Sequence, residues 1–136
     1  DGHQTGIVLR LSVLSSMEVR QRMRVCREAA LWVEANTPDG ELVWTDPFSA
    51  RALRALLPSG RALDIWEVGD MSTARGLVLW DPNEPMARDL PGYLLGRPTV
   101  PVATFDPRPS RIRGFWLHLV AGYPPPREPA EMFRIP

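Results

Sequence analysis

The sequence predicts an all-β protein: a small antiparallel β-barrel with one short inserted helix and a Pro-rich C-terminal tail. About seven short segments have the composition of strands, and turn sequences separate them at intervals of roughly 8 to 15 residues. Only one segment combines a helix cap with helical apolar spacing. Twelve of the 15 prolines lie from Pro82 onward, and proline interrupts helices and restricts strands to sheet edges.

The predicted strands are rich in β-branched, aromatic and aliphatic residues. They are residues 6–14, a stretch from about residue 29, and residues 41–45, 61–68, 77–80, 99–105 and 112–120. Helix-forming residues also make a helix possible over residues 18–35, but the alternation around Ala29 favours a strand there. A turn at residues 37–40, Thr-Pro-Asp-Gly, would create a hairpin with Trp32 and Trp44 as cross-strand neighbours.

The single helix is predicted over residues 47–57. Asp46 is suited to cap this helix, and Pro47 is suited to its first position. We expect its inward side to consist of Phe48, Ala52, Leu53, Leu56 and Leu57. Arg51 and Arg54 would then be exposed.

The chain has 136 residues, which is enough for one domain with a hydrophobic core but too few for two. Its composition, 44% hydrophobic and 24% charged, is that of a globular protein. We expect one barrel domain at residues 1–122, in which residues 1–24 lead into the barrel. Residues 123–136 would form an extended tail whose apolar side chains could dock on the body or on a partner.

Formal charges cancel, because 16 acidic residues balance 16 basic ones, all of them arginine. A net charge of zero gives no general attraction to nucleic acid or to a membrane surface, so anion recognition would depend on local clusters. One such cluster places Arg20, Arg22 and Arg24 within five residues. Arginine suits nucleotides, since its planar guanidinium forks to phosphate and stacks on a base.

Catalytic and metal-binding motifs are absent from the sequence. The single Cys26 excludes an intramolecular disulfide, and His3 and His118 provide no metal-ligand spacing. There is no phosphate-binding glycine loop, no paired-carboxylate motif and no nucleophile with a nearby base. These observations favour a binding module over an enzyme and predict no cofactor. No apolar run has the length of a membrane span, and we expect a cytoplasmic location.

Two motifs resemble those of PilZ domains, the bacterial receptors for cyclic di-GMP. Residues 20–25, R-Q-R-M-R-V, are similar to the RxxxR motif, with Arg20 and Arg24 as its two arginines. Residues 70–76, D-M-S-T-A-R-G, resemble the second motif, D/N-x-S-x-x-G, except that the glycine comes one residue late because Arg75 stands in its place. The spacing between the two motifs is also longer than in the family, owing to the inserted helix.

The resemblance implies a PilZ-like barrel that binds cyclic di-GMP or a related anionic nucleotide. The ligand-binding residues would be Arg20, Arg22, Arg24, Asp70, Ser72, Arg75 and Gly76. The arginines would hold phosphate and guanine, and the turn would add hydrogen bonds. A bacterial signalling role follows from this resemblance, with ligand binding changing contact with a protein partner.

Other interpretations remain open at this level. The arginines could form a solvated edge paired with Glu18 and Glu28, and Asp70 with Ser72 could form an ordinary turn between strands. A degenerate PilZ-like, SH3-like or Tudor-like barrel could act as an adaptor that binds protein and no nucleotide. Single-stranded nucleic-acid binding on an OB-like barrel would use the same arginines and tryptophans, but the net charge of zero argues against it.

Overall fold

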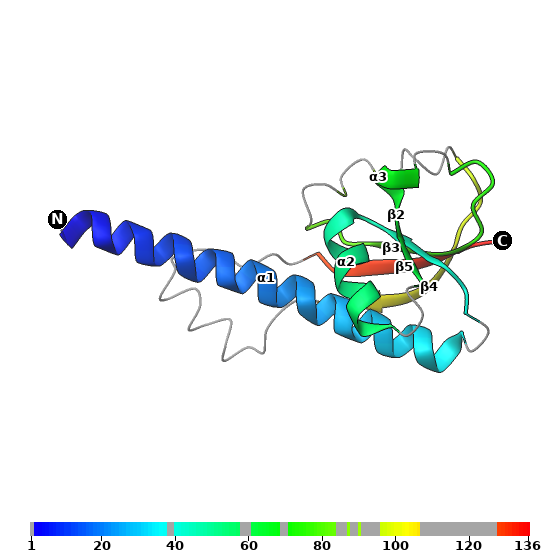
Figure 1. The fold of residues 1–136 in the computed structure, drawn as a ribbon, viewed down its shortest axis with the longest axis horizontal. Helices are drawn as coiled ribbons and strands as arrows, with labels where there is room; N and C mark the ends of the chain where they lie inside the picture. Colours follow the sequence, from blue (N-terminus) through cyan, green and yellow to red (C-terminus); the bar gives the residue numbers. More distant parts are fainter. Residues whose placement is uncertain are drawn as a thin grey trace.

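The structure is a computed structural model that describes residues 2–37, 40–57, 61–68, 71–83, 87, 90, 96–106 and 128–136, with side chains from residue 19 onward. In chain order, its elements are α1 (Gly2–Asn36), β1 (Val43–Thr45), α2 (Pro47–Leu56), β2 (Ala62–Asp64), α3 (Ile65–Val68), β3 (Gly76–Trp80), β4 (Val100–Phe105) and β5 (Ala130–Ile135) (Figure 1).

The prediction of an all-β barrel is wrong. The described residues form a mixed α/β fold in which one five-stranded sheet stays open, with β2 at one edge and β4 at the other. Strand order is β2-β1-β3-β5-β4. β1 pairs in parallel with both β2 and β3, whereas β5 pairs antiparallel with both β3 and β4. The motif β1-α2-β2 is therefore a parallel strand–helix–strand unit.

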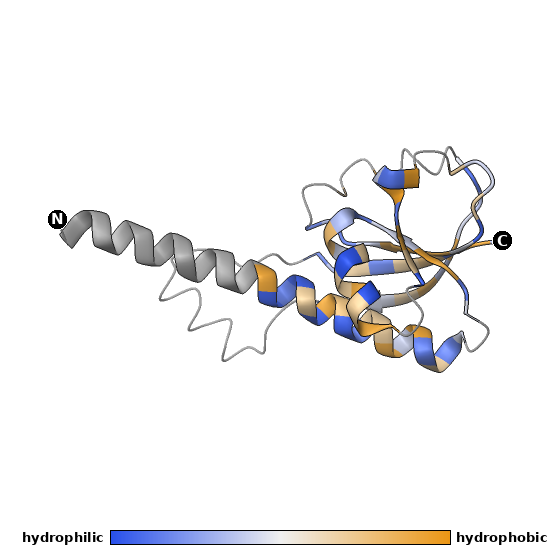
Figure 2. Cartoon of the chain, in the orientation of Figure 1, coloured by the Kyte–Doolittle hydropathy of each residue, from blue (hydrophilic) through white to orange (hydrophobic). Residues whose placement is uncertain are grey.

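The first 36 residues account for most of this difference. The strands predicted at residues 6–14 and from about residue 29 are both part of α1. The reason is a helical spacing of small and apolar residues: Val25, Ala29 and Val33 lie four residues apart and are fully buried. Figure 1 shows the N-terminal part of α1 extending away from the sheet, and Figure 2 shows hydrophilic and hydrophobic residues alternating along its described part.

No hairpin joins Trp32 to Trp44, because Trp32 is a helical residue of α1 and only Trp44 lies in a strand. α1 ends at Asn36, and the backbone N–H of the next residue, Thr37, donates to the carbonyl oxygen of Val33 at 2.9 Å. The Thr37 hydroxyl donates to the same oxygen at 2.6 Å. The two central residues of the predicted turn, 38 and 39, lie outside the described residues.

The helix predicted over residues 47–57 is confirmed as α2, Pro47–Leu56. Asp46 caps it as expected by accepting from the backbone N–H of Ser49 at 2.9 Å. Leu53 and Leu57 face the core, while Leu56 is 37% exposed and points outward more than predicted. Arg51 and Arg54 are exposed, as their positions on the helix indicated.

The remaining strand predictions had mixed outcomes. Residues 77–80 and 99–105 form β3 and β4 nearly as expected. Residues 61–68 split into β2 and the single turn α3, because the Asp64 carboxylate accepts from the backbone N–H of Trp66 at 2.9 Å and bends the chain. The strand predicted at residues 112–120 lies outside the described part of the chain.

The C-terminal residues 130–135 form β5, between β3 and β4 in the sheet. Ala130, Met132 and Ile135 are buried there, so their side chains dock on the body itself. The sequence did not predict this strand because prolines surround it. Residues 123–127, where the predicted tail begins, are outside the described residues.

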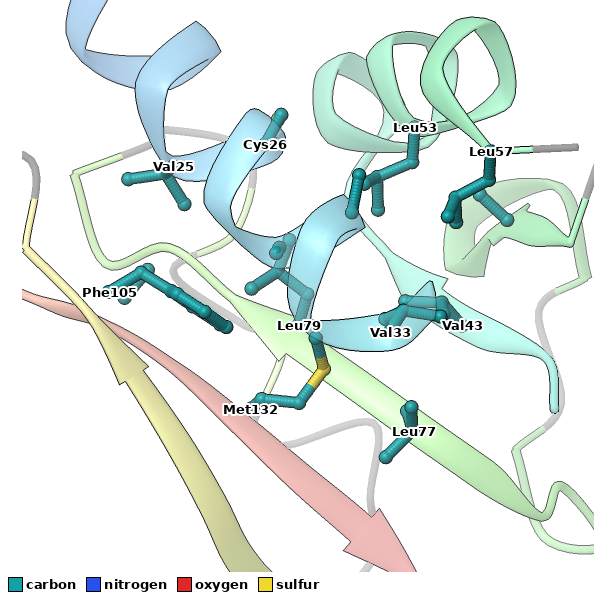
Figure 3. Packing of buried hydrophobic residues seen from close by; sticks show 14 residues of the cluster. Val25, Cys26, Val33, Val43, Leu53, Leu57, Leu77, Leu79, Phe105 and Met132 are labelled. Atoms are coloured by element: carbon teal, nitrogen blue, oxygen red, sulfur yellow. The ribbon is translucent and has the colours of Figure 1, made fainter. Parts of the chain in front are cut away.

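Two hydrophobic clusters pack on opposite faces of the sheet, because β3 points Leu77 and Leu79 to one face and Val78 to the other. The larger cluster joins α1 and α2 to the sheet; Figure 3 shows Val25 on the Phe105 side of it and Val33 next to Val43. The second cluster consists of Trp44, Ile65, Met71, Ala74, Val78, Leu90 and Ile135. α1 therefore covers one face, and the chain before β3 covers the other.

Candidate functional site

The polar groups of interest occupy three places in the described structure. The first is the outer side of α1, where two of the four predicted arginines, Arg20 and Arg24, lie. The second is the turn before β3, which corresponds to the second predicted motif. The third, which the sequence did not single out, is the sheet edge at the carboxyl ends of β1 and β3. The arrangement at each place decides what it can bind.

Arg20 and Arg24 lie on the same side of α1, one helical turn apart. Arg27 follows at the next helical position, so the three residues form one row, here named the outer arginine stripe. Arg20 and Arg27 are exposed, and Arg24 is half-buried. Leu31, which is 68% exposed, continues the row. Arg27 was not predicted, although its spacing from Arg20 and Arg24 becomes obvious once the segment is helical.

Arg22 points in a different direction from the outer arginine stripe. Its guanidinium carbon lies 5.4 Å from the ring centroid of Phe48, in the first turn of α2. Burial raises the pKa of Asp81, and the positive charge of Arg22 is near enough to oppose part of that rise. Arg22 therefore belongs to the sheet edge and not to the row formed by Arg20 and Arg24.

The second predicted motif has a structural role in the described residues. Ser72 and Arg75 are exposed, whereas Met71 and Ala74 are buried. A guanidinium nitrogen of Arg97 donates to the carbonyl oxygens of Met71 and Ala74 at 2.6 and 2.5 Å. The carbonyl oxygens of this turn are thus held by a residue that the sequence did not point to. Asp70 lies outside the described residues.

Arg75 and Gly76 connect this turn to the sheet. The carbonyl oxygen of Arg75 accepts from the indole N–H of Trp44 at 3.0 Å. Gly76 has a φ of +120°, and a Cβ added to it would lie 2.6 Å from the carbonyl oxygen of Leu42. Glycine is required there because β3 passes close to the backbone that leads into β1.

The structure does not bring the two predicted motifs together. The arginines are on α1, which packs on the face of Leu77 and Leu79. The turn at residues 71–75 packs on the opposite face, with Val78, and it precedes the first residue of β3. The structure therefore does not place Arg20 and Arg24 beside Ser72.

At the carboxyl ends of the parallel strands, each strand ends at or just before an aspartate. Asp64 is the last residue of β2, Asp46 follows β1, and Asp81 follows β3. All three are buried. Parallel strands end at one sheet edge, so these residues lie in a row there. The sequence contains this pattern, but an antiparallel arrangement would not bring these aspartates to one edge.

Asp46 is fully engaged in holding this edge. Besides the Ser49 backbone, it accepts from the Ser49 hydroxyl at 2.9 Å and from the Thr45 hydroxyl at 3.4 Å. The Thr45 hydroxyl also lies 2.8 Å from the carbonyl oxygen of Leu79 and donates to it, which links the ends of β1 and β3. The N-terminus of α2 is therefore occupied by the protein's own carboxylate, which disfavours an anionic ligand at that position.

Asp81 is held by Asn83, two residues further along the chain. Its Oδ1 accepts from the backbone N–H and the side-chain amide of Asn83, both at 3.0 Å. Burial raises the pKa of Asp81 above 3.8, and the nearby charge of Asp46 adds to this effect. The Asn83 hydrogen bonds and the charge of Arg22 act in the opposite direction. The Asn83 amide also donates to the carbonyl oxygen of Glu128 at 2.6 Å, just before β5.

Gln21 is the buried polar residue without a partner in the described structure. It is 6% exposed, and neither its amide nitrogen nor its amide oxygen makes a hydrogen bond. A buried amide left unbonded costs stability, so it calls for an explanation. No group of three or more histidine, cysteine or acidic side chains that could hold a metal ion occurs among the described residues.

Comparison with known proteins provides no family for the chain: no family model, curated protein or solved structure matches it. The resemblance to PilZ domains is therefore untested by relatives. Across the described ranges, none of the helices combines the length and apolar content that a membrane crossing requires.

Proposed function

We propose that the chain is a non-catalytic, cytoplasmic binding module that takes an anionic nucleotide of the cyclic di-GMP class on the outer arginine stripe of α1. The observation that carries this proposal is the row of Arg20, Arg24 and Arg27 along one side of a single helix. The turn at residues 71–75 has no part in it, because Met71 and Ala74 pack on the other face of the sheet.

The geometry suits a compact ligand with two phosphates. Successive members of the row are about 5 to 6 Å apart along the helix, close enough for two guanidinium groups to contact one phosphodiester ring. A helix also holds the arginines at fixed spacing, which reduces the entropy lost on binding. Charge–charge attraction at an exposed site is screened by salt, so affinity should fall as ionic strength rises.

Isothermal titration calorimetry tests the proposal. We expect the parent protein to bind cyclic di-GMP at tens of micromolar. The double variant Arg20→Ala with Arg24→Ala should bind at least about 100-fold more weakly, because two charged hydrogen-bonding groups are removed. Arg51→Ala is the matched control, since Arg51 is an exposed arginine on α2 outside the stripe. No binding by the parent, or equal binding by the double variant, would reject the nucleotide.

A protein adaptor is the second candidate, and Leu31 favours it. This side chain is 68% exposed and continues the arginine row, giving a mixed basic and apolar surface that suits an acidic protein partner. A photo-crosslinking residue at position 35, on the same side of the helix, would identify that partner in cells. Leu31→Ser with Arg27→Glu should abolish the crosslink, whereas nucleotide should leave it unchanged. Removing the C-terminal residues is not a suitable test, because β5 belongs to the sheet.

A further inference from the structure

We propose that two copies of this chain pair through the exposed side of α1, with the two helices antiparallel. The pairing goes beyond nucleotide binding and does not rest on it, because it uses the acidic residues of α1 as well as its arginines. A nucleotide and a second copy would both contact Arg20 and Arg27, so the two would compete for α1. The pairing is therefore expected, and is tested, in the absence of nucleotide.

The exposed side of α1 has the spacing of a helix that packs against another helix. Starting at residue 20, side chains on this side recur at intervals of four and three residues, the spacing that keeps one seam of a helix turned towards a partner helix. We name these residues the pairing row: Arg20, Arg24, Arg27, Leu31 and Glu34. All are exposed except Arg24, which is half-buried. A second copy can reach the row without displacing the core, because α1 packs on the sheet through its opposite side.

Charge changes sign along the pairing row. Arg20 and Arg27 are positive, whereas Glu34 is negative at the C-terminal end of the row, and Glu28 lies beside the row near its middle. Arg20 and Glu34 are about 21 Å apart along the helix axis, further than the screening length of about 8 to 10 Å in physiological salt, so they do not neutralise each other within one chain. A helix side that is basic at one end and acidic at the other is complementary to a reversed copy of itself.

A twofold axis between residues 27 and 28 brings opposite charges together. About this axis, Arg20 of one copy lies opposite the last turn of α1 in the second copy, next to Glu34 of that copy. Arg27 lies beside Glu28 of the second copy. Both contacts occur twice, because a twofold interface is self-complementary. A parallel pair would instead place Arg20 against Arg20 and Glu34 against Glu34, and like charges repel.

Leu31 gives the pair an apolar contact. At 68% exposure, it is the most exposed of the large hydrophobic side chains among the described residues. It lies on the pairing row between Arg27 and Glu34, so a second α1 would cover it and remove its apolar surface from water. Opposite Leu31 lies the stem of Arg24 of the second copy, whose methylene groups can pack on an apolar side chain. This contact adds affinity that exposed ion pairs alone do not provide.

A second copy fits the whole pairing row better than a uniformly acidic protein does. An acidic protein would attract Arg20 and Arg27, but it would meet Glu28 and Glu34 with like charge. A second copy carries both signs in the reverse order and so complements both ends. The sheet of each copy packs on the opposite side of its own α1, which leaves the two bodies on the outside of the helix pair.

Sedimentation equilibrium of the whole chain, without nucleotide, measures the pairing. We expect the parent to change from monomer to dimer as its concentration rises through about 100 μM, and to dissociate at about 0.5 M salt because exposed charges are screened. Arg20→Glu and Glu34→Arg should each weaken the dimer by at least about tenfold, since each puts like charges together at both ends of the pair. Arg51→Glu, an equal charge reversal at an exposed position of α2, is the matched control and should dimerise as the parent does.

Mixing the Arg20→Glu and Glu34→Arg variants distinguishes this pairing from a loss of folding. In the mixed dimer, one end keeps the natural pair of Arg20 with Glu34 and the other end has the same pair reversed, so dimerisation should return to within about tenfold of the parent.

Three results would overturn the pairing: a parent that stays monomeric up to about 1 mM, which leaves the row to another partner, a Glu34→Arg variant that dimerises as the parent does, or a mixture that stays monomeric. Glu34→Arg keeps every residue of the outer arginine stripe. Calorimetry of that variant with cyclic di-GMP therefore tests the nucleotide proposal separately from the dimer.

Discussion

Replacing Gly76 with alanine probes a close approach between the start of β3 and the backbone of Leu42. Gly76 has a φ of +120°, where an L side chain is strained, and its added Cβ would lie 2.6 Å from the carbonyl oxygen of Leu42. That oxygen accepts from the backbone N–H of Leu77 at 2.9 Å, so it cannot move without loosening the contact between β1 and β3.

The magnitude follows from two costs. Holding a residue with a Cβ at positive φ costs about 1 to 2 kcal/mol. Relieving a clash with fixed backbone adds about 1 to 3 kcal/mol, as in overpacked cores. We therefore expect Gly76→Ala to lower the free energy of unfolding by about 3 kcal/mol. For a chain of this size, the melting temperature should fall by about 10 °C.

Gly96→Ala is the matched control. Gly96 also has a positive φ, +70°, but an added Cβ there meets nothing within 4 Å. It should therefore lose only the conformational term, about 1 kcal/mol. Urea unfolding followed by circular dichroism measures both variants. Equal destabilisation of the two would show that the approach of β3 to Leu42 does not constrain Gly76, and the reasoning would be refuted.

Three further predictions use the same unfolding assay. Asp46→Ala should lower the free energy of unfolding by about 2 kcal/mol, since it removes the cap of α2 and the acceptor of the Ser49 hydroxyl. Asp46→Asn should lower it much less, because asparagine also caps helices. Leu53→Ala should lower the free energy of unfolding by about 3 kcal/mol, because Leu53 is fully buried. Leu56 is 37% exposed, so Leu56→Ala should lower it by less than about 1 kcal/mol. Similar losses in the two variants would contradict the assigned helix face. Asp81 has a folded pKa raised above 3.8, so the native state holds its proton more tightly, and its contribution to stability should fall as pH rises through that folded pKa. Asp81→Asn should remove this dependence, and an unchanged pH profile would show that Asp81 is not responsible for it.

The sequence predicted those elements whose determinants are local. Asp46 and Pro47 identify the start of α2 because a cap and a first-turn proline act within a few residues. The short apolar runs at β3 and β4 are likewise recognisable without knowing their neighbours. These features led to correct strands and a correct helix, but they contain no information on strand order or direction.

The errors arose where two periodicities compete. Val25, Ala29 and Val33 fit both the two-residue repeat of a strand and the four-residue spacing of a helix. The strand repeat was preferred, so α1 was not predicted. Cys26 and Ala30, also buried, fit only the helical repeat, so the correct answer was present in the sequence. With the α1 segment interpreted as strands, the sequence offered about seven strands and one short helix, a composition that favours an antiparallel barrel.

The candidate sites show the same dependence on topology. Arg20 and Arg24 were expected in a segment leading into a barrel, whereas they lie on α1, where a spacing of four residues brings them to one side of the helix. Gln21 could not be recognised, since its burial depends on the sheet beneath α1. Asp81 gains interest only when β1 and β3 are known to be parallel, because only then do Asp46 and Asp81 share an edge.

The central position of β5 has a consequence for how the chain is made. Trp80 pairs with Glu131, so about fifty further residues must be synthesised after β3 before β5 can pair with it. While residues 130–135 remain inside the ribosome, β3 would present an unpaired edge and β4 would have no strand to join. A nascent chain should therefore be prone to aggregation, and depend on chaperones, until β5 has left the ribosome.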